Sequence, residues 1–242
     1  MCTVSFLPGS GKIFITSNRD ENTKRPPAEI PARQDIGPYS FVCPKDPLAG
    51  GTWIATRNDG SAMVLLNGAS EKHERQPAYR MSRGRIFWDV FMPEYSVRTF
   101  ADIALHDIEP FTLVLWQNGE LTEMRWDGSG KSLFQKDAGS PHIWSSCTLY
   151  TDEEIRHRKA HFEQWCLDQK EYSVDEILKF HLFAGQNEDD KRRIRINRDG
   201  KMLTVSVSCI ETGPGNSLFH YSDLVTGQNH HTALKCIQSC NG

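Results

Sequence analysis

The sequence lacks the features that mark several common classes of protein. It has no apolar run long enough to cross a bilayer, no linker, and no repeat or low-complexity tract. Its 242 residues carry a formal net charge of -3, so no positive field attracts nucleic-acid phosphates. We therefore expect no transmembrane segment and no nucleic-acid partner. No feature of the sequence predicts an oligomeric state.

We also expect neither a secretory leader nor a disulfide framework. The first residues alternate like a strand, where a leader has a basic segment followed by an apolar one. The seven cysteines are odd in number and scattered, and a chain of this length can bury a core without crosslinks. These observations predict a cytoplasmic protein with reduced thiols.

Short alternating segments separated by Gly, Asn and Asp predict antiparallel strands. They read TVSFL, KIFITS, TWIAT, SAMVLL, FTLVLW, ELTEMRW, MLTVSVSCI and SLFHYSDL, and residues 191–196 alternate in the same way. Helical spacing predicts four helices, near 82–91, 97–106 and 151–167, and after a capping box at Ser173 and Glu176. The sequence thus predicts one α+β domain over residues 1–242, with helices packed on antiparallel sheets.

The cysteine in second position is the first candidate for chemistry. If Met1 is removed, Cys2 carries both a thiol and a free α-amine, whose ordinary pKa of about 7.7 to 8.0 suits a base near neutrality. A turn within LPGSGK that pairs Leu7 with Lys12 places Cys2 opposite Ser17, within a range of 16–18. The tetrapeptide NRDE at 18–21 then emerges beside the thiol.

The first three residues of this tetrapeptide have predicted roles. Arg19 favours the thiolate of Cys2, and Asp20 orients Arg19 or holds the α-amine. Asn18 is predicted to contact the substrate. The similar NRDG at 197–200 ends in glycine and predicts a hairpin turn.

A second hairpin is predicted to contribute further residues to the site. A two-residue turn at Asp59 and Gly60 pairs Thr52 with Asn67 and brings GGTW against LLNG. Thr52 and Trp53 are then predicted to contact the substrate, and the amide of Asn67 to stabilise an oxyanion. Two simpler interpretations stay open, in which Asn67 closes a turn and GGTW is a bulge.

With these motifs, the sequence resembles the NRDE family, whose eukaryotic members are the transport and Golgi organisation two proteins. The resemblance rests on MCTVSF, SNRDEN, DPLAGGTW and SRG, and is dense over residues 1–91. That family is similar to cysteine N-terminal-nucleophile hydrolases, which implies a four-layer αββα sandwich and a cysteine that attacks a linear amide. Those hydrolases separate their arginine and aspartate by two residues, whereas Arg19 and Asp20 are adjacent. They use an oxyanion asparagine where this chain has Ser145 and Ser146, so Asn67 is the candidate donor and Ser146 a substrate contact.

Two functions follow from these features. The first is hydrolysis of a non-peptide carbon–nitrogen bond in a small acyl substrate, with Cys2 as nucleophile and no metal or organic cofactor. The second is a non-catalytic protein that carries a lipid-like or haem-like ligand on the same fold. Both predict a small-molecule acyl or lipid-like partner.

Overall fold

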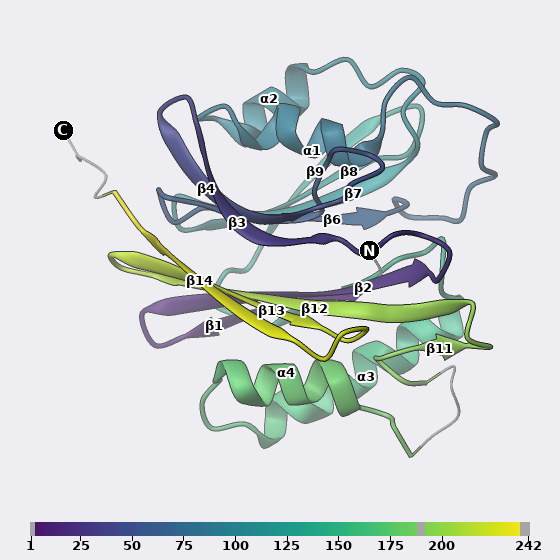
Figure 1. The fold of residues 1–242 in the computed structure, drawn as a ribbon, viewed down its shortest axis with the longest axis vertical. Coiled ribbons are helices and arrows are strands. Elements are labelled where there is room, and N and C mark those ends of the chain that lie inside the picture. Colours follow the sequence, from purple (N-terminus) through teal and green to yellow (C-terminus); the bar gives the residue numbers. More distant parts are fainter. Residues whose placement is uncertain (1–2, 188–191, 238–242) are drawn as a thin grey trace.

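The protein is a stack of two antiparallel sheets with a pair of helices on each outer face (Figure 1). This computed structural model describes residues 3–187 and 192–237. Helices α1 and α2 cover one sheet and helices α3 and α4 cover the other, so the order of layers is αββα. The α+β sandwich expected from the sequence is confirmed.

The first sheet contains the two ends of the described chain. Its strand order is β10-β1-β2-β12-β13-β14, and β11 pairs with β12. The bounds are β1 Thr3–Gly9, β2 Lys12–Asn22, β10 His142–Ser145, β11 Asn197–Arg198, β12 Met202–Gly213, β13 Asn216–Asp223 and β14 Asn229–Lys235. Strand β2 therefore has a neighbour on each side, one adjacent in sequence and one about 180 residues away.

The second sheet is built from consecutive hairpins in the order β3-β4-β5-β6-β7-β8-β9. The bounds are β3 Glu29–Ile36, β4 Tyr39–Lys45, β5 Ile54–Arg57, β6 Ala62–Asn67, β7 Phe111–Gln117, β8 Glu120–Trp126 and β9 Lys131–Lys136. Strands β3, β4 and β9 were not predicted. Most of the β3 and β9 side chains are exposed and do not alternate clearly, whereas β4 is a run of mostly buried residues without alternation.

The four helices lie close to their predicted positions. They are α1 Arg83–Phe91, α2 Ser96–Asp102, α3 Asp152–Asp168 and α4 Val174–Phe183. Thr151 and Glu154 form a capping box at α3, whereas at α4 the Ser173 side chain accepts from Glu176 N. Helix α2 ends earlier than expected because Ile103 has extended backbone. No helix in the described ranges has the length and apolar composition to cross a membrane.

Three groups of buried apolar side chains hold the layers together, and the two larger ones lie on opposite faces of the first sheet. The largest fills the space between the sheets and extends under α1 and α2, and it includes Val4, Ile15 and Phe87. The second lies between the first sheet and helices α3 and α4, and it includes Phe14 and Phe180. Successive β2 side chains thus enter different cores, as expected for a strand buried on both faces.

The tetrapeptide NRDE is part of a strand and not of a turn. Strand β2 continues through it to Asn22, and the partner strand β12 shifts register opposite Arg19 and Asp20, between Ser206 and Thr204. Such a β-bulge bends the strand and re-aims the side chains around it. The bulge therefore lies directly beside two of the predicted site residues.

The register predicted for the first hairpin is wrong by two residues. Leu7 pairs with Phe14 and not with Lys12, because Pro8 and Gly9 remain in the strand and the turn contains Ser10 and Gly11 alone. Gly11 has φ 71°, which suits a tight hairpin turn. Proline is tolerated because β10 pairs with residues 3–6 only, so Pro8 lies beyond it.

The register predicted for the second hairpin is wrong by one residue. Its turn has three residues, since Arg57 N donates to Ser61 O, and Ile54 pairs with Val64. Thr52 lies before β5 and does not pair with Asn67. A three-residue turn with glycine at positive φ, here Gly60, is a standard alternative that the letters NDGS do not exclude.

The two predictions near residues 191–200 have different outcomes. The hairpin turn at NRDG is confirmed, with Asp199 and Gly200 at positive φ between β11 and β12. The strand predicted over 191–196 is wrong within its described residues, 192–196, which are irregular. Ile194 and Ile196 are buried there, so alternating burial occurs without strand pairing.

Candidate active site

A cavity of about 660 Å³ opens where strands β2 and β6 end, and it gathers most of the predicted site residues. Arg19, Asp20, Thr52, Trp53 and Asn67 all line it. The predicted nucleophile, Cys2, lies outside the described residues. The next residue, Thr3, begins β1 and pairs with Asn18.

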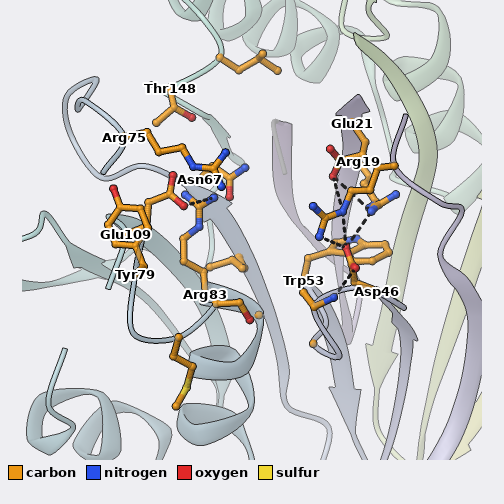
Figure 2. A pocket seen from close by; sticks show the side chains of 18 of the residues that line it. Arg19, Glu21, Asp46, Trp53, Asn67, Arg75, Tyr79, Arg83, Glu109 and Thr148 are labelled. Atoms are coloured by element: carbon orange, nitrogen blue, oxygen red, sulfur yellow. Dashed lines mark hydrogen bonds and ion pairs between the residues drawn. The ribbon is translucent and has the colours of Figure 1, made fainter. Parts of the chain in front are cut away.

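Arg19 forms one side of this cavity (Figure 2). Its guanidinium carbon lies 4.7 Å from the centre of the Trp53 ring, and its Nη2 lies 3.2 Å from Asp46 Oδ2 and 3.4 Å from Glu21 Oε2. The Arg19 side chain is only 4% exposed, so screening by solvent is weak. Arg19 is thus fixed by an aromatic face and two carboxylates.

Asp46 holds this side of the cavity together and was missed from the sequence. It accepts from Arg25 Nη2 at 2.8 Å and from the backbone N–H groups of Leu48 and Ala49 at 3.0 Å. Burial raises the pKa of Asp46, but the Ala49 N–H, the Arg25 hydrogen bond and the charges of Arg25 and Arg19 outweigh it and hold the pKa below its usual value. Its only sequence signal is its place at the start of DPLAGGTW.

Asp20 points to the opposite face of the sheet from Arg19, because the two residues are consecutive in a strand. Its carboxylate accepts from the Tyr150 hydroxyl, and its Oδ1 accepts from Thr204 Oγ1 at 2.5 Å. Its exposed fraction is 5%, although it still reaches the cavity. The carboxylate beside Arg19 is therefore Asp46, and no hydrogen bond or ion pair between Arg19 and Asp20 is present in the described structure.

Asn67 ends strand β6 on the other side of the cavity. Its carbonyl accepts from Ser146 Oγ at 2.8 Å, and Ser146 Oγ also lies 2.9 Å from Thr148 Oγ1. Ser146 is 1% exposed and does not line the cavity. The structure therefore places Ser146 behind Asn67, where it joins the two sheets.

Charged side chains surround Asn67. Figure 2 shows Asn67, Arg75, Tyr79, Arg83, Glu109 and Thr148 facing the Arg19 side of the cavity. Arg83 Nη2 lies 3.1 Å from Glu109 Oε2, and its Nη1 donates to Pro110 O at 3.3 Å. The lining thus carries charged and polar groups on both sides of the cavity.

The motifs GGTW and SRG meet at the cavity. A Cβ added to Gly51 would lie 2.5 Å from the carbonyl carbon of Gly84, so the two backbones are in direct contact. Only glycine at position 51 permits this approach. Two motifs about 30 residues apart in the sequence therefore form one structural unit beside Trp53.

Two other residues that were predicted to contact the substrate use their side chains in hydrogen bonds within the protein. Asn18 faces the helical layer, where its Nδ2 donates to His181 O at 3.2 Å, and it does not line the cavity. Thr52 lines the cavity, but its hydroxyl donates to Pro44 O at 2.7 Å. The structure thus brings five of the eight predicted residues to one cavity and places Asn18 and Ser146 behind it.

The five described cysteines are free, as expected. Burial raises the pKa of the Cys43 and Cys209 thiols to about 12, and also raises those of Cys147 and Cys166. These thiols are poor nucleophiles at neutral pH. In the described part of the chain, no group of three or more His, Cys, Asp or Glu side chains is placed to hold a metal ion.

Solved structures share this architecture. The C2A mutant of conjugated bile acid hydrolase from Clostridium perfringens matches with a TM-score of 0.53 and 10% identity, over 96% of this chain and 92% of that one. The Caenorhabditis elegans orthologue of N-acylethanolamine-hydrolyzing acid amidase matches with a TM-score of 0.58 and 13% identity, over 86% and 92%. The fold is thus that of the N-terminal-nucleophile hydrolases.

Sequence comparison identifies the family. No curated protein matches the sequence at a significant level. The model of the Transport and Golgi organisation 2 family matches residues 1–216, well beyond the region where the motifs are dense. The NRDE, GGTW and SRG motifs that surround the cavity all fall within this match. The chain therefore belongs to the Transport and Golgi organisation 2 family.

Proposed function

We propose that the protein is an amidohydrolase that cleaves a non-peptide carbon–nitrogen bond in a small acyl substrate, with Cys2 as its nucleophile after removal of Met1. One observation carries the proposal: Thr3, the residue bonded to Cys2, pairs with Asn18 at the point where β2 delivers Arg19 and Asp20 to a cavity. Consecutive Cα atoms are about 3.8 Å apart, so chain connectivity keeps Cys2 near this point.

The first step uses groups on both sides of the cavity. The Cys2 sulfur attacks the amide carbon while the Cys2 α-amine takes the thiol proton. The Arg19 cation favours the thiolate, and the Asp20 carboxylate holds the α-ammonium that results. The Asn67 amide donates to the oxyanion of the tetrahedral intermediate.

The second half of the reaction releases both products. The α-ammonium returns its proton to the departing amine as the carbon–nitrogen bond breaks, which leaves a thioester on Cys2. Water then attacks the thioester carbonyl, with the α-amine as base, and the acyl group leaves as a carboxylic acid. Proton and electron counts balance without a cofactor.

The proposal is tested by mass spectrometry and a panel of N-acyl amides. We expect the intact protein to lack Met1, Cys2 to react with iodoacetamide at least about tenfold faster than the buried thiols, and a substrate to leave an acyl adduct on Cys2. The C2A variant should fold normally and lose turnover, while a C147A variant keeps it. Turnover that survives in C2A, or saturable ligand binding without any hydrolysis and with Met1 retained, would overturn the proposal.

A further inference from the structure

A second charged group lies behind the candidate site, on the helical side of the first sheet. Arg158 of α3 is 0% exposed. Its Nη1 donates to Thr3 Oγ1 at 3.0 Å and to Ile194 O at 3.3 Å, and its Nη2 donates to Arg193 O. Arg158 forms no ion pair with any carboxylate within residues 3–187 and 192–237.

Such a cation costs free energy. A buried charge without a counter-ion loses its hydration and gains no attraction from a partner in return. The Nε atom of Arg158 also lacks a hydrogen-bond partner among the described residues. An apolar side chain would fill this space with a smaller loss of hydration free energy. We therefore ask what the contacts of the Arg158 charge do for function.

One of these contacts leads to Asp20. The guanidinium carbon of Arg158 lies 3.7 Å from the centre of the Tyr150 ring, and the Tyr150 hydroxyl donates to Asp20 Oδ2. A cation on the face of a phenol draws electron density from the ring, which strengthens its hydroxyl as a donor. Arg158 thus reaches the Asp20 carboxylate through one aromatic ring.

The other contact leads to the start of β1. Thr3 receives the Arg158 hydrogen bond, and Thr3 is bonded to Cys2. Arg158 therefore holds both the residue next to the proposed nucleophile and the tyrosine that holds Asp20. Neither Arg158 nor Tyr150 lines the cavity, so neither contacts the substrate there.

The other ionisable groups around Arg158 have hydrogen-bond or ion-pair partners of their own. His181 of α4 bonds to Ser5 and Asn18, and burial, followed by the Arg158 charge, lowers its pKa to about 3. Arg198 of β11 lies 5.4 Å from the Tyr150 ring centre and pairs with Glu154 at 2.9 Å. At neutral pH this neighbourhood holds the Arg158 cation, the paired Arg198 and a neutral histidine.

We propose that Arg158, through Thr3 and Tyr150, is the positioning residue that sets Cys2 and Asp20 for acyl transfer. This inference rests on the function proposed above. Its charge adds positive potential behind the site and favours the Cys2 thiolate, and the Tyr150 hydroxyl fixes the Asp20 carboxylate and neutralises part of its charge.

The test measures the rate of Cys2 alkylation by iodoacetamide between pH 5 and 10, with intact mass as the readout. Y150F and R158Q should slow alkylation at pH 7 by about tenfold and move its midpoint up by about one pH unit, since each makes the potential at Cys2 more negative. R158K keeps the charge and should shift the midpoint less. The reaction needs no substrate, so it reports on positioning alone.

Two variants serve as matched controls. Y172F removes a tyrosine hydroxyl in the same helical layer, where the Tyr172 ring stacks on Trp165. R156Q removes an exposed positive charge two residues from Arg158. Both should keep the wild-type midpoint. Because Y150F deletes one hydroxyl and little volume, it carries the test if R158Q fails to fold.

The outcomes separate this inference from the proposed function. If wild-type Cys2 reacts quickly and a folded Y150F or R158Q keeps the wild-type midpoint, positioning by Arg158 is wrong and the proposed function stands. If wild-type Cys2 reacts no faster than the buried thiols, the proposed function is wrong and this inference falls with it. A purely structural role for Arg158 lowers the melting temperature without moving the midpoint.

Discussion

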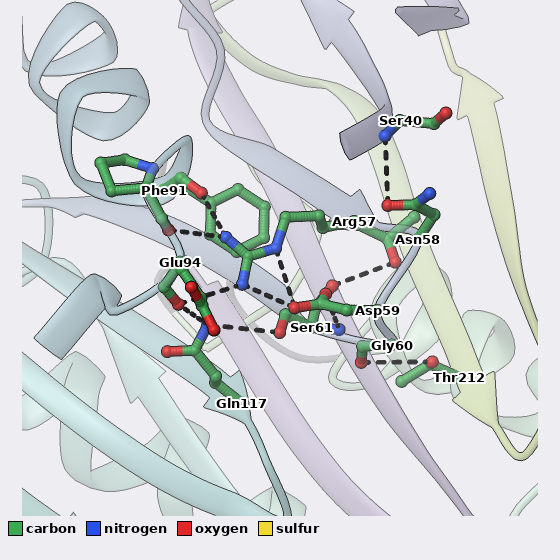
Figure 3. A network of polar contacts seen from close by, with 12 residues as sticks. Ser40, Arg57, Asn58, Asp59, Gly60, Ser61, Phe91, Glu94, Gln117 and Thr212 are labelled. Atoms are coloured by element: carbon green, nitrogen blue, oxygen red, sulfur yellow. Dashed lines mark hydrogen bonds and ion pairs between the residues drawn. The ribbon is translucent and has the colours of Figure 1, made fainter. Parts of the chain in front are cut away.

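Two arginine side chains are completely buried in the described part of the chain, one beneath each helical layer. Arg57 lies between the second sheet and α1, where its Nη2 is 2.6 Å from Asp59 Oδ2 and its Nη1 donates to the carbonyls of Phe91 and Pro93 (Figure 3). Among the described residues, Arg158 has carbonyl and hydroxyl partners but no carboxylate. The Arg57 network is balanced in charge and remote from the candidate site, whereas the Arg158 network is unbalanced and touches it.

This difference separates structural from functional use of the same side chain. Arg57 joins the turn after β5 to the end of α1, and every one of its partners belongs to the surrounding fold. Arg158 joins α3 to Thr3 and, through Tyr150, to Asp20. We therefore expect substitutions at Arg57 to change stability and substitutions at Arg158 to change reactivity.

The largest expected effect is on the stability of the Arg57 network. R57Q leaves the Asp59 carboxylate and three backbone carbonyls without their donor, so it should lower the free energy of unfolding by about 3 to 5 kcal/mol. Urea titration checks this value. The pH midpoint of Cys2 alkylation in the folded variant should equal that of the wild type. A loss below about 1 kcal/mol, or a shifted midpoint, would erase the distinction between the two arginines.

A smaller effect is the pH dependence of stability that comes from His181, the histidine beside Arg158. His181 titrates near its ordinary pKa of about 6.5 when unfolded but at about 3 when folded, so only the unfolded chain binds this proton in between. Its contribution is complete above pH 6.5 and declines as the pH falls toward 3, by about 2 kcal/mol at pH 5. Urea titrations of wild type and H181Q at pH 7 and pH 5 measure it. Equal pH slopes for the two proteins would contradict it.

The carboxylate of Asp59, which pairs with Arg57, contributes to stability over a different pH range from that of His181. Burial raises its pKa, but the hydrogen bonds and charge of Arg57 outweigh this and hold the pKa below its usual value. Its contribution is therefore present above the unfolded pKa of about 3.9 and declines as the pH falls through the folded pKa. D59N should remove this acid-limb loss between pH 4 and pH 2 and leave the slope between pH 7 and pH 5 unchanged.

The smallest expected change in stability lies beside the cavity. S146A removes the donor to the Asn67 carbonyl and should lower the free energy of unfolding by about 1 kcal/mol. It should also reduce kcat more than it changes KM, because Asn67 is proposed to meet the oxyanion and not the ground-state substrate. Steady-state kinetics on a substrate identified with the panel of N-acyl amides, with S140A as a control, give the two constants. An unchanged kcat would show that Asn67 needs no support from Ser146.

The helices and most of the hairpins could be predicted because they depend on residues that are close together in the sequence. The helices and most hairpins follow from spacing, caps and turn residues, all of which act within a few positions. The register errors have the same origin, since LPGSGK and NDGS each permit more than one turn length. Five of the eight site residues still line one cavity. They lie at the end of β2, at the end of β6 or just before β5, and a register error changes the pairing partner of a residue without changing the strand end that carries it.

The partners of the site residues were not predictable in this way. Tyr150 meets Asp20 across 130 positions, Arg158 meets Thr3 across 155, and Thr204 meets Asp20 across 184. Tyr150 comes from an irregular segment, and the carbonyls that bind Arg158 belong to another. No periodicity links such positions, so only the tertiary fold reveals them.

The long separation between β2 and β12 has a consequence for synthesis of the chain. Asn22 ends β2 and Met202 begins its partner, so about 180 residues must be added before that side of β2 can pair. At roughly 5 to 20 residues per second, this takes about 10 to 40 s. We expect β2, and with it Arg19 and Asp20, to lack this neighbour until synthesis of the chain is nearly complete.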